Sequence, residues 1–397
     1  MDNSESRPLY LDPNLQIVFG VSLMAVLGVS SVTPAFPRIG RALDISTQAV
    51  GHLIAAFTLP GVLFTPILGV LTDRCGRKQV LIPALMVFGL AGGACALARS
   101  IDLLLVLRFV QGIGAAALNV LYITLIGDLY KNTRQTVAMG WNASVISVGT
   151  AAFPVVGGAL ASLGWYYPFL LPILAVPIAV AALFILENPE PEKAQRLPKY
   201  LQQTWASVKH GQALAFLLLT LMTFVIIYGA YLTYLPFVME NAFQASPLVI
   251  GTLMSGTSLA TAVASSQLGK LTKLCSEKVL LQFACGFYAL ALVSIPRAPS
   301  LAVLWISATL FGIAQGLSIP NLQTSLASLA PLEHRGAFIS ANALVLRVGQ
   351  TLGPPLMAVA SGLGGIPTTF YAGAAIAVAM LALTTTSIKE AKGKGER

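Results

Sequence analysis

The chain has 397 residues, of which 56% are hydrophobic and only 10% are charged. Its mean hydropathy of +0.79 is far above that of a soluble domain with a polar surface, so composition indicates an integral membrane protein. The 24 basic residues outnumber the 15 acidic ones, giving a net charge of +9, but they are spread by membrane side and not gathered into a patch for nucleic acid.

Apolar runs recur along the whole chain. A helix needs about 20 apolar residues to cross roughly 30 Å of hydrocarbon, and the alternating pattern of membrane β-strands is absent. The sequence therefore predicts an all-α membrane protein with twelve spans. These lie at about 15–36, 48–70, 79–98, 103–127, 137–160, 166–186, 212–238, 248–269, 279–296, 301–329, 337–361 and 366–387.

The distribution of positive charge predicts the orientation of these spans. The polar N-terminal segment contains acids and lacks the basic region and cleavage site of a secretory signal, so the first run should remain as a span. With this end inside, eighteen basic residues fall on one side of the membrane, four on the other and two within helices. The positive-inside rule then predicts that both termini are cytoplasmic in a plasma or inner membrane, with anionic lipid headgroups as partners.

The chain reads as two similar halves. A linker rich in proline and charge is predicted over 187–211, between six-helix bundles at 1–186 and 212–397. A shift of 200 residues aligns GVLTDRCGRKQVL (69–81) with GKLTKLCSEKVLL (269–281). Two parallel repeats with a solute site near mid-membrane describe one class of transporters, so the bundles are expected to be pseudo-symmetric.

The segment GVLTDRCGRKQVL places four charges between spans two and three, where it predicts a tight cytoplasmic turn. Gly69 and Gly76 would allow close approach and a sharp reversal of the backbone. Asp73 can accept backbone donors or pair with a cation, and Arg77 and Lys78 would anchor the turn inside. The alternative interpretation is a generic basic loop.

This segment resembles the signature loop of the major facilitator superfamily, in particular its drug:proton antiporter branch, with Thr72 in place of the usual alanine. The resemblance extends over the whole chain. It implies that Asp73 and Arg77 form a charge network with Asp128, at the cytoplasmic end of span four, and that this network locks the cytoplasmic gate while the carrier faces outward.

Two further segments carry the resemblance. LLVLRFVQGIGAAAL (104–118) is similar to the motif of span four, in which the arginine, here Arg108, handles protons or substrate and is followed by Gln111. A structural clamp on helix carbonyls is the alternative role for Arg108. GWNASVISVGTAAFPVVGG resembles the antiporter motif of span five, with Phe153 at a glycine position. Its matching residues, for which the family implies close packing and a bend, are Gly140, Gly149, Pro154, Gly157 and Gly158.

Ionisable residues deep in the membrane are the natural site candidates. Arg347 lies about ten residues from either end of its run and would serve substrate binding or gating, or else a buried interhelical bond. His52 would titrate near neutral pH or act as an interfacial polar residue. All fifteen acids fall outside the apolar cores, so two embedded arginines favour a neutral, zwitterionic or anionic solute over a cation.

Polar, uncharged residues complete the predicted cavity. Tyrosine supplies an apolar ring and one hydrogen bond, which suits amphiphilic ligands. The spacing Tyr-x-x-Tyr-x-x-Tyr predicts one helical stripe of three tyrosines, with packing or interface aromatics as the alternative. The candidates are Asn119, Tyr122, Tyr228, Tyr231, Tyr234, Gln315, Asn321 and Gln323.

The sequence predicts a monomeric secondary transporter that exports a small amphiphilic solute by alternating access, coupled to protons. The first alternative is a facilitator or anion carrier without proton coupling, and the second is a non-transporting sensor. There is no GxSxG, P-loop or HExxH motif, and the four cysteines show no CxxC spacing, so no enzyme activity, cofactor or metal is expected.

Overall fold

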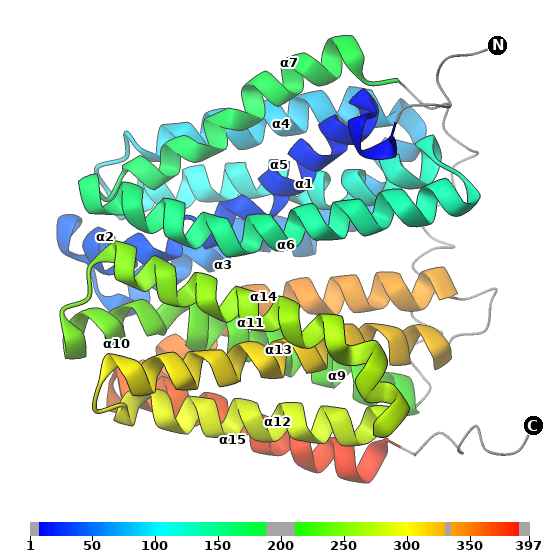
Figure 1. The fold of residues 1–397 in the computed structure, drawn as a ribbon. Helices are drawn as coiled ribbons and strands as arrows, with labels where there is room; N and C mark the ends of the chain where they lie inside the picture. The colour runs from blue at the N-terminus through cyan, green and yellow to red at the C-terminus, as the bar shows by residue number, and fades with distance from the viewer. Residues whose placement is uncertain (1–7, 188–210, 330–334, 389–397) are drawn as a thin grey trace, which may run out of the picture. The chain divides into compact units, whose positions relative to one another are not determined.

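The computed structural model describes residues 8–187, 211–329 and 335–388, and the regular structure in these ranges is helical (Figure 1). Twelve helical segments of the described chain are long and apolar enough to cross a membrane. They coincide with the twelve predicted spans, so the all-α, twelve-span prediction is confirmed. The predicted linker at 187–211 lies almost entirely outside the described residues.

Helical segments of the first half follow one another with short breaks. They are η1 (Leu9–Leu11), α1 (Pro13–Ser30), η2 (Thr33–Ala35), α2 (Phe36–Ala42), α3 (Thr47–Cys75), α4 (Arg77–Cys95), α5 (Ile101–Leu129), α6 (Asn132–Leu163), η3 (Tyr167–Leu174) and α7 (Ala175–Ile185).

The second half has the same character. Its segments are α9 (Gly211–Val225), η4 (Ile226–Leu232), α10 (Thr233–Phe243), α11 (Pro247–Leu274), α12 (Glu277–Ser294), η5 (Ile295–Arg297), α13 (Leu301–Leu329), α14 (Arg335–Gly364) and α15 (Ile366–Ser387). The segment η4 is π-helical and joins α9 to α10 within one span.

The helices form two compact units that do not follow the halves strictly. The first unit contains the described first half except Ser46–Ala55, together with Ser246–Gly251 from the beginning of α11. The second unit contains the remainder of the described second half and Ser46–Ala55. Each unit therefore includes a few residues from a helix that mostly belongs to the other.

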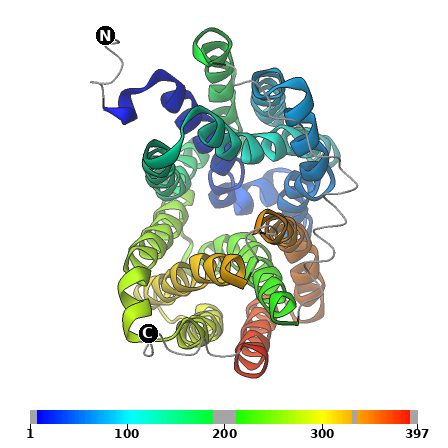
Figure 2. The same cartoon turned by 90° about the vertical axis from the view of Figure 1, so that its right-hand side faces the viewer.

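Equivalent helices pair in the two units. In the first unit α1 packs on α6 and α4 packs on α5, and in the second α9 packs on α14 and α12 packs on α13. Figure 2 shows many of these helices nearly end-on within each unit. The internal repeat in the sequence is thus accompanied by a repeated order of helix packing.

Two lysines 200 residues apart bind the C-terminal ends of equivalent helices. The Nζ of Lys78 donates a 2.9 Å hydrogen bond to the carbonyl oxygen of Leu186, directly after α7. The Nζ of Lys278 donates a 3.0 Å bond to the carbonyl oxygen of Thr385 near the end of α15. A cation at a helix C-terminus satisfies free carbonyls and complements the helix dipole, so each lysine fastens the third helix of its repeat to the sixth.

The π-helical segment η4 lies against α14. A Cβ atom on Gly229 would come within 2.5 Å of the carbonyl oxygen of Gly353, so the two backbones approach closely only because both residues are glycine. The hydroxyl of Thr233 donates to the carbonyl oxygen of Tyr228 at 2.7 Å, which is a spacing of five residues. A wider turn of this kind changes the direction of the side chains around it.

Candidate functional site

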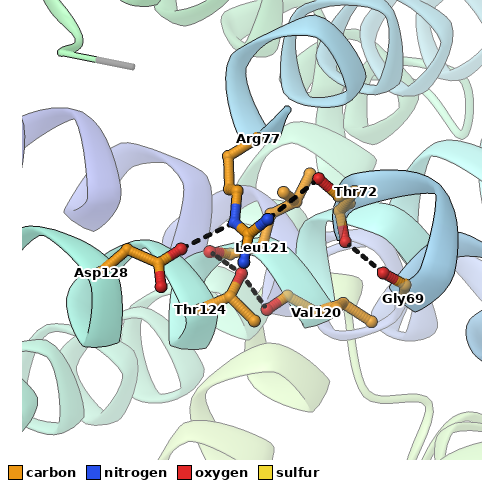
Figure 3. A network of polar contacts seen from close by, with 7 residues as sticks. All are labelled: Gly69, Thr72, Arg77, Val120, Leu121, Thr124 and Asp128. Carbon is orange, nitrogen blue, oxygen red and sulfur yellow. Dashed lines mark hydrogen bonds and ion pairs between the residues drawn. The ribbon is translucent and has the colours of Figure 1, made fainter. Parts of the chain in front are cut away.

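The turn between α3 and α4 is organised by Arg77, the first residue of α4 (Figure 3). Its Nε donates a 2.7 Å hydrogen bond to Asp128 Oδ2 in α5, forming an ion pair. Its Nη1 donates to the carbonyl oxygen of Thr72 in the last turns of α3 at 3.1 Å. The side chains of Arg77 and Asp128 are 7% and 27% exposed, so water screens this pair only partly.

Glycine and threonine have distinct roles in this turn. Gly76 has φ of +94°, a region that side-chain-bearing residues rarely adopt, so the reversal here requires glycine. A side chain on Gly69 would meet no atom within 4 Å, so the prediction that Gly69 allows close approach is wrong. Thr72 stands where the signature loop usually has alanine, and its hydroxyl donates a 2.7 Å hydrogen bond to the Gly69 carbonyl oxygen.

Two other charged residues, Asp73 and Lys78, belong to the predicted network. Asp73 lies in α3, and its side chain lies outside those that the structure describes. Lys78 is bonded to the carbonyl oxygen of Leu186 after α7. The described part of the network therefore includes Arg77, Asp128 and the backbone of Thr72.

A related polar cluster occupies the equivalent place in the second unit. Glu277 stands 200 residues after Arg77 and begins α12. Its Oε2 accepts a 2.7 Å hydrogen bond from Ser325, and its backbone carbonyl accepts a 3.0 Å bond from Asn321, both in α13. Asn321, which was predicted to line the cavity, is 1% exposed and belongs to this cluster.

Arg108 is enclosed within the first unit and is 0% exposed. Its guanidinium donates to the carbonyl oxygen of Gly28 in α1 at 2.8 Å and to Gln111 Oε1 at 2.9 Å. The same group lies 4.3 Å from the centroid of the Phe57 ring, a cation–π distance. This geometry fits the clamp on helix carbonyls that was the alternative interpretation of Arg108.

Arg347 makes the same local contact but is only half-buried. Its Nη1 donates to Gln350 Oε1 at 3.0 Å, again three residues along the helix. Tyr228, in the π-helical segment that packs on α14, is also half-buried. Tyr228, Arg347 and Gln350 form a partly accessible polar cluster in the second unit, hereafter the Arg347 cluster.

The three tyrosines of the predicted stripe have different surroundings. The ring of Tyr231 stacks on Phe311 with centroids 4.1 Å apart, and its hydroxyl lies 2.5 Å from that of Thr257. Tyr234 is 0% exposed, whereas Tyr228 is half-buried. The single-stripe prediction assumed a regular α-helix, whereas Tyr228 and Tyr231 lie in a π-helical segment, where side chains are spaced differently around the helix axis.

The remaining candidates differ in their local surroundings. The side-chain amide of Asn119 donates to the Ala115 carbonyl oxygen at 2.8 Å in its own helix, and Tyr122 beside it is half-buried. Gln315 accepts a 3.1 Å hydrogen bond from Thr261. Gln323 and His52 are exposed.

The antiporter-type segment of α6 contains glycines with unequal roles. A Cβ atom on Gly157 would collide with the backbone of Ser31, and one on Gly158 would collide with the Pro247 backbone. On Gly149 it would come 2.6 Å from the Leu23 side chain, whereas on Gly140 it would meet no atom within 4 Å. Pro154 lies inside α6. Close packing thus requires glycine at 157 and 158, where the near atoms are backbone, whereas the Leu23 side chain can move aside at 149.

Sequence reasoning missed two buried interhelical hydrogen bonds. The hydroxyl of Ser22 in α1 donates to Asn142 Oδ1 in α6 at 2.7 Å. The hydroxyl of Thr220 in α9 donates to Asn342 Oδ1 in α14 at 3.0 Å. The two asparagines are 200 residues apart, so the internal repeat contained the signal that could have found them.

Acidic and metal-binding groups are sparse inside the described helices. No described Asp or Glu side chain is buried, although Arg77 and Arg108 are. In the part of the chain that the structure describes, no three His, Cys, Asp or Glu side chains gather into a metal site. The buried polar side chains of the described helices are therefore arginines, amides and hydroxyl groups.

Comparison with known proteins places this geometry in context. The family model described as "Major Facilitator Superfamily" matches residues 18–242 and 238–397. The chain is 26% identical over 341 residues to "Multidrug resistance protein 2" of Bacillus subtilis (strain 168), covering 84% of this chain and 85% of that protein. It is 26% identical over 364 residues to the "Bacillibactin exporter" of the same strain, covering 87% and 89% respectively.

The fold also matches solved structures. A crystal structure of a nucleoside transporter superposes with a TM-score of 0.79 at 12% identity, covering 96% of this chain and all of the other. At this identity the likeness concerns the fold alone.

Proposed function

The chain belongs to the major facilitator superfamily and is a membrane transporter, and on this premise we propose that it exports a small amphiphilic solute by alternating access, driven by protons. Two relatives that align over more than four fifths of the chain are named as a multidrug resistance protein and an exporter. These names support efflux over import. Transport by this superfamily also accounts for the lack of any enzymatic motif.

The observation that carries the proposal is the ion pair of Arg77 with Asp128, supported by the Thr72 carbonyl. It joins the last turns of α3, the beginning of α4 and the end of α5 in one bonded group. Because this ion pair is only partly exposed, it holds these helix ends together. Protonation of Asp128 would neutralise the negative member of the pair. We infer that a proton bound by Asp128 breaks this ion pair.

The proposed solute-binding group is the Arg347 cluster in the second unit. It combines a phenol, a guanidinium and an amide, and two of its three side chains are half-buried. Because no described acidic side chain is buried, the electrostatics favour a neutral, zwitterionic or anionic amphiphile.

The topology belongs to the same proposal. We propose two bundles at 1–186 and 212–397, joined by a linker at 187–211. We also propose that both termini lie on the cytoplasmic side of the plasma membrane and that the protein is a monomer in the lipid bilayer. The excess of basic residues on one side supports this orientation. Accessibility of cysteines introduced after residue 388 and in the α5–α6 turn would test it.

The experiment that tests export is reconstitution in liposomes with a pH dye in the lumen. Cationic, neutral and anionic amphiphiles are added in turn, and solute and proton fluxes are recorded together. We expect proton movement opposite to solute movement, strongest for a neutral or anionic solute, and abolished in Asp128→Asn. Solute flux without proton flux would contradict proton coupling.

A facilitator or anion carrier is the second candidate, favoured by the same lack of a buried acidic side chain in the described chain. It predicts solute flux that is independent of an imposed pH gradient but sensitive to Arg347→Gln. A non-transporting sensor would show no solute flux in the liposome experiment.

A further inference from the structure

A cavity of about 810 Å³ lies at one end of the first unit. Its polar lining comes mainly from Asp12, Tyr130, Lys131, Arg134 and Glu187. Four spans meet here, because α1 and α6 begin and α5 and α7 end at this point. The cavity therefore lies where the helices leave the hydrocarbon and enter water.

The described lining of the cavity contains acidic and basic side chains that do not form ion pairs with one another. Asp12 and Glu187 are acidic, and Lys131 and Arg134 are basic, yet no ion pair joins these four side chains in the described chain. Asp12 accepts a 2.9 Å hydrogen bond from the Asn14 N–H as the cap of α1, which leaves its charge in place. The lining could therefore receive a cation and an anion at once.

Two more groups of the cavity lack partners. Helix α6 begins after Lys131 without any side-chain cap, so its first N–H groups remain available to an anion. Tyr130 is 5% exposed, and its hydroxyl lies near the Asp12 carboxylate without a well-aligned hydrogen bond to any described residue. Burial and the nearby Asp12 charge raise the pKa of Tyr130, so the phenol keeps its proton at neutral pH and can donate it to a ligand.

The cavity is bordered by features typical of a membrane interface. Tyr10 of η1 packs on Trp141 of α6 with ring centroids 5.4 Å apart, and Trp141 is 45% exposed. Tyrosine and tryptophan concentrate at the level of lipid headgroups. Leu11 and Ile185 also line the cavity and are 52% and 49% exposed, which leaves apolar surface for an acyl chain beside the polar groups.

We propose that this cavity binds the headgroup of a zwitterionic aminophospholipid. The phosphate lies against Lys131, Arg134 and the N-terminus of α6, and the primary ammonium lies between Asp12 and Glu187. A solute that is only anionic would meet the two carboxylates unpaired, and one that is only cationic would meet the two basic groups unpaired. Bound lipid would tie together the beginning of α1, the α5–α6 turn and the end of α7.

Lipid binding is measured by native mass spectrometry of the purified full-length chain in detergent. The chain is titrated with dioleoyl phosphatidylethanolamine, with dioleoyl phosphatidylcholine, whose quaternary ammonium donates no N–H, and with anionic dioleoyl phosphatidylglycerol. We expect the ethanolamine lipid to bind about fivefold more tightly than either of the others, as two weak charge-assisted contacts allow. Soluble glycerophosphoethanolamine carries the same headgroup and should compete only at far higher concentration.

Three variants separate the proposed contacts without removing the fold. Asp12→Asn with Glu187→Gln removes the negative charge but keeps a residue able to cap α1, and should abolish the preference for ethanolamine over choline. Lys131→Ala with Arg134→Ala should weaken the binding of all three lipids, and Tyr130→Phe should weaken it by a smaller factor. Lys270→Ala with Lys273→Ala changes exposed basic residues of the second unit and is the matched control.

Equal affinity for the three lipids, or a preference that the cavity variants leave intact, would overturn the inference. Competition by soluble glycerophosphoethanolamine at the concentration of the lipid would also overturn it, in favour of a soluble zwitterion. Binding is measured without transport, so its failure is distinct from failure of the proposed export.

Discussion

The hydroxyl of Ser22 donates a 2.7 Å hydrogen bond to the side-chain oxygen of Asn142, and both residues are buried in the first unit. Thr220 and Asn342 form the same contact at 3.0 Å in the second unit. Each bond joins the first and fifth spans of its repeat. Because a buried hydroxyl or amide in hydrocarbon needs a partner, these bonds select which faces of the two helices meet.

Loss of the hydroxyl bond should have a modest and equal cost in both units. Ser22→Ala and Thr220→Val each remove one interhelical hydrogen bond, for which about 0.6 kcal/mol is typical inside membranes. We expect each variant to melt at a slightly lower temperature in detergent than the parent, and the double variant to show the sum. A melting temperature unchanged in both single variants would show that the bonds do not stabilise the units.

Arg77 and Asp128 should be energetically coupled. Their partial burial places the pair between surface pairs and fully buried ones, so a double-mutant cycle of Arg77→Gln and Asp128→Asn should give about 1–3 kcal/mol of coupling. Transport should fall by about tenfold or more in either single variant, since about 1.4 kcal/mol is a factor of ten in an equilibrium.

The control for this cycle is Asp102→Asn, an exposed acid in the first turn of the same helix α5. It should leave transport unchanged. Additive effects of Arg77→Gln and Asp128→Asn would contradict the role of the ion pair.

The glycines of α6 offer a matched pair of substitutions. Gly157→Ala should be destabilising by about 1–3 kcal/mol, because the added methyl group collides with the backbone of Ser31, which cannot move aside as a side chain could. Gly140→Ala adds the same methyl group in open space and should be neutral or slightly stabilising, since alanine favours helices. Thermal unfolding in detergent measures both, and equal effects would refute the packing explanation.

The two membrane arginines should respond differently to truncation. Arg108→Ala leaves a cavity and two groups without their donor, Gln111 and the Gly28 carbonyl, so we expect a loss of about 3 kcal/mol or more of stability. Arg347→Ala affects a half-buried side chain and should change the KM for solute with little change in melting temperature. Unchanged transport kinetics in a folded Arg347→Ala variant would remove Arg347 from the proposed site.

Tyr228 and Tyr231 provide the corresponding test on η4. Tyr231→Phe removes a hydroxyl bonded to Thr257 but keeps the stack on Phe311, so about 1 kcal/mol of stability should be lost with solute affinity retained. Tyr228→Phe should instead reduce solute affinity at nearly constant stability. The reverse result would place the solute at Tyr231 and contradict the assignment of the Arg347 cluster.

Much of the architecture was predictable from local features of the sequence. Twelve spans follow from twelve apolar runs, because the thickness of the hydrocarbon sets a length that each run satisfies by itself. The repeat of 200 residues was visible in the loops at 69–81 and 269–281. The contact of Arg77 with Asp128 was implied by family resemblance, since those residues occupy the positions of its signature.

The surroundings of particular side chains were decided only by tertiary structure. Hydropathy treats Arg108 and Arg347 alike, and each contacts a glutamine three residues later, yet one is enclosed by Gly28 and Phe57 while the other is half-buried. Tyr228 and Tyr231 lie in one π-helical segment, which the regular spacing in their sequence did not predict. Composition and periodicity determine whether a helix crosses the membrane, whereas the environment of a side chain depends on distant segments that pack beside it.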